Sequence, residues 1–410
     1  MLLTDSSNNT HLSYCTNIHA GEAWPDVLQS LYEHVPTVRA SVPDDTPFGL
    51  GLRVSASASK ALQSHTAREE LRSFLTKTNT YLFTINGFPY GTFHGQPVKE
   101  GAYKPDWTQP ERLGYTNDLA TLLAEFLPAQ DTAGQPVQGS VSTVPGSYKP
   151  WINGDESKLA LIAGQMVQHV AHLVSLKETT GNTIALALEP EPCCLLETID
   201  ETVDFFQQRL FSQAAQTQLS QLTGLSLTEA NDALHTHIGV CYDVCHAAVE
   251  FENPIDSIRQ LQHAGITIPK VQLSSALRLT NVTAASVNHL KPFAEPVYMH
   301  QVVEKNRRNE LSRFNDLADA FRGGAIDAGS EWRVHFHVPV FLDTMEHFDT
   351  TQHFLKEILT LQAREPVTHH LEIETYSFNV LPQQYQQVSV AQAIAREMHW
   401  VQTQLADARV

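Results

Sequence analysis

One short segment combines a strand-like alternation with two prolines and a group of carboxylates, and it strongly limits what this chain can fold into. It runs from Ile184 to Glu197. In its first part, small residues alternate with bulky aliphatic ones, as in a barrel strand that turns its small face inward and its bulky face toward helices. The prolines at 190 and 192 lack the N–H group that a strand ladder needs, so they end the strand. Three carboxylates therefore lie at or just beyond its C-terminal end, where α/β proteins bind ligands: those of Glu189, Glu191 and Glu197.

Strand-like and helix-like segments alternate along the whole chain. Such alternation predicts parallel strands joined by crossover helices. We expect one (β/α)8 TIM barrel as a single domain over residues 1–410, with an open doubly wound sheet as the alternative fold. The polar stretch 279–331, after the seventh strand, is interpreted as an insertion. The eight strands are expected near 12–17, 48–54, 81–86, 139–144, 184–189, 237–243, 269–274 and 369–375.

The charge balance excludes one class of partner. Lys and Arg number 27 and Asp and Glu number 45, a net charge of −18, which argues against nucleic-acid binding because that requires a basic surface. The N-terminus has no signal-peptide pattern, and we find no apolar run long enough to span a membrane. The five cysteines are odd in number, as expected of reduced thiols. These features predict a cytoplasmic protein without a membrane span.

Four of the predicted strands carry a polar side chain on the inner face at or near the C-terminal end: Glu189, Asp243, Gln272 and Glu374. A divalent cation at a barrel mouth needs several such oxygen ligands from different strands. His246 adds an imidazole three residues after Asp243. Each residue alone is commonly a helix cap or a solvated group, but their joint pattern predicts a metal site. The Gly-, Pro- and aromatic-rich loop that starts at Asn86 is a candidate for ligand binding.

Several of these motifs resemble a known superfamily. Leu186-Ala-Leu-Glu-Pro190, Asp243-x-x-His246 and a glutamate at strand eight are similar to the xylose-isomerase-like TIM barrels, which include sugar (phosphate) isomerases/epimerases and endonuclease IV. Longer motifs, beginning at Tyr14, Asn86, Ala187, Cys241 and Glu372, resemble the EboE family of metabolite-traffic proteins. That family belongs to an operon linked to making or exporting small secondary-metabolite precursors.

The resemblance implies roles for single residues. Glu189 and Glu374 would bind the metal and act as acid and base, Asp243 would be a further ligand, and His246 and Arg278 would contact substrate. Gln272 stands where the family has a histidine; its amide oxygen suits a hard cation, which favours Mg2+ or Mn2+ and leaves Zn2+ possible. The alternation of inner and outer positions leaves Glu191 open as the alternative to Glu189, and Glu372 as the alternative to Glu374.

A second histidine motif, His335-x-His337, leaves two interpretations open. It resembles, in place and spacing, the Asp-x-His loop that binds additional zinc ions in endonuclease IV, or it is an ordinary buried strand at the barrel rim. We assign both histidines to substrate binding, together with Asn86, Glu191 and Glu197.

The expected function is that of a divalent-metal-dependent isomerase or epimerase. Its substrate would be a small polyol, sugar or cyclitol-type metabolite in a secondary-metabolite precursor pathway, with other pathway enzymes as candidate partners. Two alternatives remain: a non-catalytic metabolite carrier, and a metal-dependent phosphoesterase of the endonuclease IV type.

Overall fold

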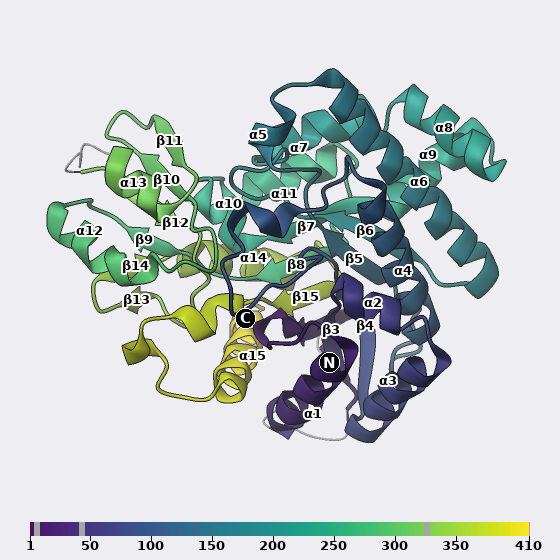
Figure 1. The fold of residues 1–410 in the computed structure, drawn as a ribbon, viewed down its shortest axis with the longest axis horizontal. Helices are drawn as coiled ribbons and strands as arrows, with labels where there is room; N and C mark the ends of the chain where they lie inside the picture. Colours follow the sequence, from purple (N-terminus) through teal and green to yellow (C-terminus); the bar gives the residue numbers. More distant parts are fainter. Residues whose placement is uncertain (4–8, 41–45, 324–328, 410) are drawn as a thin grey trace.

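The computed structural model describes residues 1–3, 9–40, 46–323 and 329–409, and within them eight parallel strands form the expected barrel (Figure 1). The sheet order is β1-β2-β15-β8-β7-β6-β5-β4-β3, in which β1 (Leu2–Leu3) pairs with β2 in antiparallel fashion. Each barrel strand otherwise lies beside its neighbour in chain order. The parallel strands are β2 (Thr10–Tyr14), β3 (Phe48–Arg53), β4 (Thr80–Asn86), β5 (Gly139–Thr143), β6 (Ile184–Leu188), β7 (Ile238–Asp243), β8 (Lys270–Leu273) and β15 (His370–Ile373).

The ring of strands is nearly closed, and its weakest joint lies between β2 and β3. A single isolated bridge joins the two, between Cys15 and Gly51. The backbone N–H of Arg53 also donates to the Thr16 hydroxyl over 2.9 Å. All the other neighbouring strands of the ring share regular ladders.

Helices surround the barrel and cover the bulky outer faces of its strands (Figure 1). Local sequence sets their ends: Ser226 and Glu229 form a capping box at the start of α9, and Gly181 ends α6 with a φ of 80°. The helices of the barrel are α1 (Trp24–Ala40), α2 (Ala56–Ala61), α3 (His65–Thr78), α4 (Pro110–Phe126), α5 (Lys149–Ile152), α6 (Glu156–Thr180), α7 (Ile199–Phe205) with the π-helical η3 (Phe206–Leu210), α8 (Gln213–Thr223), α9 (Leu227–His237), α10 (Val244–Val249), α11 (Pro254–His263), α14 (Gln352–Arg364) and α15 (Val390–Asp407). Short 3-10 helices are η1 (Thr16–Ile18), η2 (Lys99–Tyr103), η5 (Tyr376–Val380) and η6 (Gln383–Tyr385).

In the described part of the chain, α6 is the one helix long and apolar enough to cross a membrane, with a mean hydropathy of 1.4 over its most apolar window. Half of that window is buried, and α6 packs against α4 and α8. A core helix with a wide apolar face has the same composition, so α6 is weak support for a membrane span.

A second, six-stranded sheet is built from residues between the seventh and eighth barrel strands. It lies at the left of the barrel in Figure 1 and has the order β11-β10-β12-β9-β14-β13, with antiparallel pairing throughout. Its strands extend beyond both ends of the expected insertion, 279–331. The elements are β9 (Leu277–Leu279), α12 (Ala284–Leu290), η4 (Lys291–Phe293), β10 (Val302–Lys305), β11 (Leu311–Phe314), α13 (Leu317–Gly323), β12 (Glu331–Val334), β13 (Thr344–Met345) and β14 (Phe348–Thr350).

The barrel interior holds a buried ion pair. Lys270 Nζ lies 2.6 Å from Glu372 Oε1, and neither side chain is exposed. Gly51 makes room for this pair, since a Cβ atom there would lie 1.7 Å from Glu372 Oε2 and 2.9 Å from the Tyr14 carbonyl oxygen. Gly51 therefore both closes the ring of strands and accommodates the Glu372 carboxylate.

We predict that Gly51→Ala lowers the free energy of unfolding by about 1–3 kcal/mol, the usual cost of overpacking a core. Gly114→Ala is the matched control: Gly114 is an exposed residue of α4 with open space around its Cβ position, so the same change should stabilise that helix slightly. Urea titrations of both variants measure the difference. Equal stability of the two variants would contradict the packing assigned to Glu372.

Candidate functional site

Three carboxylates from three different strands meet at the C-terminal mouth of the barrel. Glu189 follows β6, Asp243 ends β7 and Glu374 follows β15, and one oxygen of each lies within 4.8 Å of the others. All three residues are buried. Among the described residues, Glu189 Oε2 and Asp243 Oδ2 have no hydrogen-bond partner. Buried carboxylate oxygens without partners are costly, so the donor set fits a divalent cation.

Burial and mutual repulsion shift the pKa values of these carboxyl groups. Burial, and then the charge of Asp243, raises the pKa of Glu189; burial, and then the charges of Glu189 and Asp243, raises the pKa of Glu374. Burial also opposes ionisation of Asp243, but His246, His337 and hydrogen bonds hold its pKa below the ordinary value. Asp243 is thus the carboxylate that ionises first, and the two glutamates become anionic more easily when a cation compensates them.

Two amides hold Glu374 in place. Asn17 Nδ2, from η1, donates to Glu374 Oε1 over 2.7 Å, and Asn86 Nδ2, at the end of β4, donates to the same oxygen over 3.3 Å. Asn86 was expected at the site, whereas Asn17 was not. A signal for Asn17 was present, because it is a polar residue at the end of the expected first strand, 12–17, as the predicted polar groups are at the ends of later strands.

Gln272 lies level with Asp243 on the neighbouring strand, where the two residues are paired in the ladder between β7 and β8. Its amide oxygen accepts a hydrogen bond from the Cys241 thiol over 3.2 Å, and its Nε2 has no partner among the described residues. The side chain is completely buried. The amide oxygen expected to bind a metal is therefore engaged by a thiol in this structure.

The two glutamates that the sequence left as alternatives take other positions. Glu191 accepts hydrogen bonds from the Tyr103 hydroxyl over 2.7 Å and from Gln301 Nε2 over 3.0 Å. Burial raises the pKa of Glu191 to about 7. Glu372 lies in the barrel interior beside Lys270. The structure thus brings Glu189 and Glu374 into the carboxylate group and leaves Glu191 on the pocket wall.

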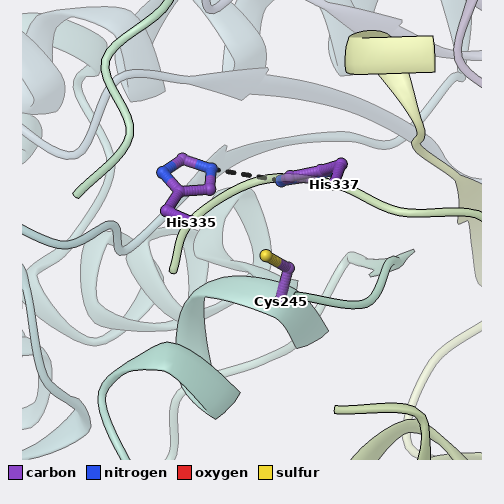
Figure 2. Close-up of side chains that lie close together, drawn as sticks. All are labelled: Cys245, His335 and His337. Carbon is purple, nitrogen blue, oxygen red and sulfur yellow. Dashed lines mark hydrogen bonds between the residues drawn. The ribbon is translucent and has the colours of Figure 1, made fainter. Parts of the chain in front are cut away.

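Three histidines form a second group beside the carboxylates. His246 belongs to α10, and His335 and His337 lie on the segment after β12. The Nε2 atoms of His246 and His335 are 3.0 Å apart, and those of His335 and His337 are 3.2 Å apart. Figure 2 shows His335 and His337 above the Cys245 thiol. One possible metal-binding atom each of Cys245, His335 and His337 lies within 4.8 Å of the other two, and the same holds for Asp243, His246 and His337.

The outer nitrogens of the three rings fix their tautomers. Nδ1 of His246 donates to the Pro190 carbonyl over 2.9 Å, and Nδ1 of His337 donates to the Glu374 carbonyl over 2.8 Å. Nδ1 of His335 contacts Gln301 Oε1 at 2.6 Å. A carbonyl oxygen only accepts, so these contacts favour a proton on Nδ1, which leaves Nε2 of a neutral ring free to bind a metal ion. The Nε2–Nε2 contacts are hydrogen bonds only where one of the two nitrogens carries a proton. This imidazole group could hold a metal ion, and it shares Asp243 with the carboxylate group.

Two residues expected at the site lie elsewhere. Glu197 accepts the backbone N–H of Cys193 over 2.7 Å and pairs with Lys149. Arg278 lies on β9 and pairs with Glu331 at 2.9 Å. It lines a separate surface cleft of the inserted sheet. Neither side chain lines the cavity at the carboxylate group.

The space between the atoms of that cavity, with the open solvent at its mouth included, amounts to about 560 Å³. Its walls combine Glu189, Glu374, His246 and His335 with several aromatic rings from the loop after β4, the inserted region and the segment after β15, whereas Asp243 and His337 lie behind this lining. The lining residues are Asn17, Asn86, Phe88, Pro89, Phe93, Val98, Lys99, Ala102, Tyr103, Glu189, Glu191, His246, Tyr298, Met299, His335, Glu374 and Tyr376.

Sequence comparison does not identify this chain: no protein-family model and no curated protein matches it. Solved structures do match. A D-tagatose 3-epimerase-like protein has 12% identity, coverage of 97% of this chain and 98% of its own, and a TM-score of 0.46. The IolI protein with a bound zinc atom has 10% identity, coverage of 98% and 99%, and a TM-score of 0.46.

A xylose isomerase-like TIM-barrel protein from Mycobacterium smegmatis, solved in complex with magnesium, superimposes with a TM-score of 0.51. The identity is 11%, and the match covers 98% of this chain and 97% of the other. Similarity at this level shows the fold alone. The chain has a xylose isomerase-like TIM-barrel fold.

Proposed function

We propose that this protein is a divalent-metal-dependent isomerase or epimerase that acts on a small polyol, sugar or cyclitol-type metabolite. One observation carries the proposal: buried carboxylates from three strands converge over a cavity, and Glu189 and Asp243 each retain an oxygen without a hydrogen-bond partner among the described residues. The xylose isomerase-like TIM-barrel protein from Mycobacterium smegmatis, which has the same fold, was solved in complex with magnesium, and this supports the metal in the proposal.

Glu189, Asp243 and Glu374 would hold the metal. An all-oxygen set suits Mg2+ or Mn2+, whereas the neighbouring imidazole group, with His246, His335 and His337, suits Zn2+. When bound, the ion would polarise a substrate carbonyl and acidify the adjacent carbon.

Glu189 and Glu374 would move the proton. They leave the barrel from β6 and β15, which are separated in the sheet by β7 and β8, so they approach the cavity from different sides. Asn17 and Asn86 fix the Glu374 carboxylate through the same oxygen, Oε1. A base held in one orientation within hydrogen-bond reach of a substrate carbon is what general base catalysis requires.

The pathway assignment rests on the sequence motifs. We propose that the protein acts in the cytoplasm, with other enzymes of an EboE-type secondary-metabolite precursor pathway and without nucleic-acid partners. The carrier alternative would keep the cavity but would not require the acid and base. The phosphoesterase alternative would require a basic channel, and the net charge of −18 speaks against it.

We predict that Mg2+ or Mn2+ stabilises protein that has first been stripped with a chelator. An ion at a hundred times its dissociation constant would add about 2.7 kcal/mol to the free energy of unfolding, seen as a rise in Tm. Asp243→Asn should lose the rise, whereas Glu178→Gln, which changes an exposed residue of α6, should keep it. No rise in the wild-type protein, or an equal rise in Asp243→Asn, would contradict the assigned site.

Replacement of Glu374 tests the chemistry. Glu374→Gln should slow the exchange of the substrate's carbon-bound proton with deuterated solvent by about 10²–10⁴-fold, the usual contribution of an acid or base. NMR spectra of D-fructose, D-tagatose and scyllo-inosose incubated with metal-loaded protein measure the exchange. Circular dichroism should show an unchanged fold, and Glu178→Gln should exchange like the wild type. Wild-type exchange rates in Glu374→Gln would exclude the assigned role.

A further inference from the structure

Among the residues that the structure describes, the cavity offers no available cationic side chain to an anionic substrate. Among the described residues that line it, Lys99 is the only Lys or Arg. Its Nζ donates to the Asp316 carboxylate over 2.6 Å and to the Tyr298 carbonyl over 2.6 Å, and it lies 3.4 Å from the Glu295 carbonyl oxygen. These three acceptors use the three donors of the ammonium group. The segments outside the described residues, 4–8, 41–45, 324–328 and 410, contain no Lys or Arg in their sequence.

The arginines beside the cavity wall are occupied as well. Arg53 pairs with Glu22 at 3.0 Å and donates to carbonyls of the loop after β4. Arg112 donates to the carbonyls of Pro105, Gly87 and Phe88, and it is completely buried. Both arginines stabilise the loop that carries the aromatic wall. Arg53 Nε and Arg112 Nη2 have no partner among the described residues, but neither arginine lines the cavity. Each edge of either guanidinium already contains a donating nitrogen, so neither offers the free edge for the bidentate contact that phosphate and carboxylate groups favour.

Helix N-termini are the other common anion sites, and the two α-helices that begin beside the carboxylate segments, α7 and α10, are capped by the protein's own side chains. At the start of α10, Asp243 Oδ1 accepts the backbone N–H of His246. At the start of α7, Thr198 and Glu201 form a capping box. An anion at either position would meet a carboxylate in place of free N–H groups.

The cavity itself is acidic. Glu189, Glu191 and Glu374 line it, and Asp243 adjoins them. With Asp243, Glu189 and Glu374 ionised around it, one divalent ion would leave at least one of their three negative charges uncompensated. A phosphate or carboxylate group on a substrate would therefore approach uncompensated negative charge in a partly dehydrated space.

Aromatic rings form the remaining wall. The ring centroids of Phe93, Tyr298 and Tyr376 lie 5.0–5.3 Å from one another. Such a cluster presents apolar ring surface beside a few polar groups, which is the composition of pockets for uncharged small ligands. The C–H face of a sugar or cyclitol ring has the size and polarity to cover it.

Resting on the proposed function, we infer that the substrate is an uncharged polyhydroxy carbonyl compound, and that the site excludes phosphorylated and carboxylated analogues. The Lys99–Asp316 ion pair contributes to this selection because it neutralises Lys99, the only lysine or arginine among the described residues that line the cavity. Hydroxyl groups would be recognised by the carboxylates and histidines, and the ring by the aromatic cluster.

Ligand-observed NMR titrations of metal-loaded protein test the inference with matched pairs. D-Fructose and D-tagatose should bind at least ten-fold more tightly than their 6-phosphates. Equal or tighter binding of the phosphates, or no binding of either neutral sugar, would overturn the inference. The titration measures binding affinity, so its result does not depend on whether the protein turns the sugar over. Neutral sugars that bind without proton exchange would refute only the proposed function, and exchange confined to the phosphates would refute only this inference.

Asp316→Ala tests the part assigned to the ion pair. Release of Lys99 should tighten binding of D-fructose 6-phosphate and of inorganic phosphate several-fold and leave D-fructose binding unchanged. Asp319→Ala is the matched control, because Asp319 forms an exposed ion pair with Arg322 outside the cavity. No gain in phosphate binding by Asp316→Ala over Asp319→Ala would overturn the role of the Lys99–Asp316 pair.

Discussion

Crowded negative charge inside the barrel is the constraint on which the rest of this structure depends. Glu372 meets Lys270 as a fully buried pair, which uses the interior cation and leaves Glu189, Asp243 and Glu374 without one. Removing ions from water is expensive, and like charges in a buried space raise that cost further. The carboxylates remain together only because the strands that carry them are fixed by the barrel. A cation is the natural complement of such an arrangement, and the cavity above it is where a substrate would reach that cation.

The sequence predicted the barrel well because the signal is local. Small residues alternate with bulky ones in β6 and β7, and the prolines after β6 mark its end, so the inner position of Asp243 could be assigned from alternation. Alternation left Glu189 and Glu191 as alternatives, and the resemblance to the family favoured Glu189. The sequence predicted an insertion at 279–331 but not the sheet that it helps to form. Its strands have two to four residues, too few for a periodic pattern, and its pairing brings β9 between β12 and β14, which no local rule indicates.

Several contacts at the site that the sequence did not predict join residues far apart in the chain. Gln301 contacts both Glu191 and the Tyr103 hydroxyl, and these partners are more than one hundred residues away in the chain. His335 and His337 meet His246 only because the inserted region returns over the barrel mouth. The alternation of residues along one strand contains no information about contacts between residues so far apart in the chain. The same return places Tyr298 on the cavity wall, so the insertion shapes the space that a ligand would fill.

The incomplete joint between β2 and β3 divides the barrel into a stiff part and a compliant part. Glu189 and Asp243 follow strands that are paired on both sides, whereas Asn17 follows a strand that borders the joint. Elastic deformation of a ring concentrates where its links are fewest. Breathing of this barrel would therefore change the distance from Asn17 to Glu374 while the opposite wall stays still, so the position of the Glu374 carboxylate, proposed above as an acid or base, would depend on barrel mechanics as well as on charge.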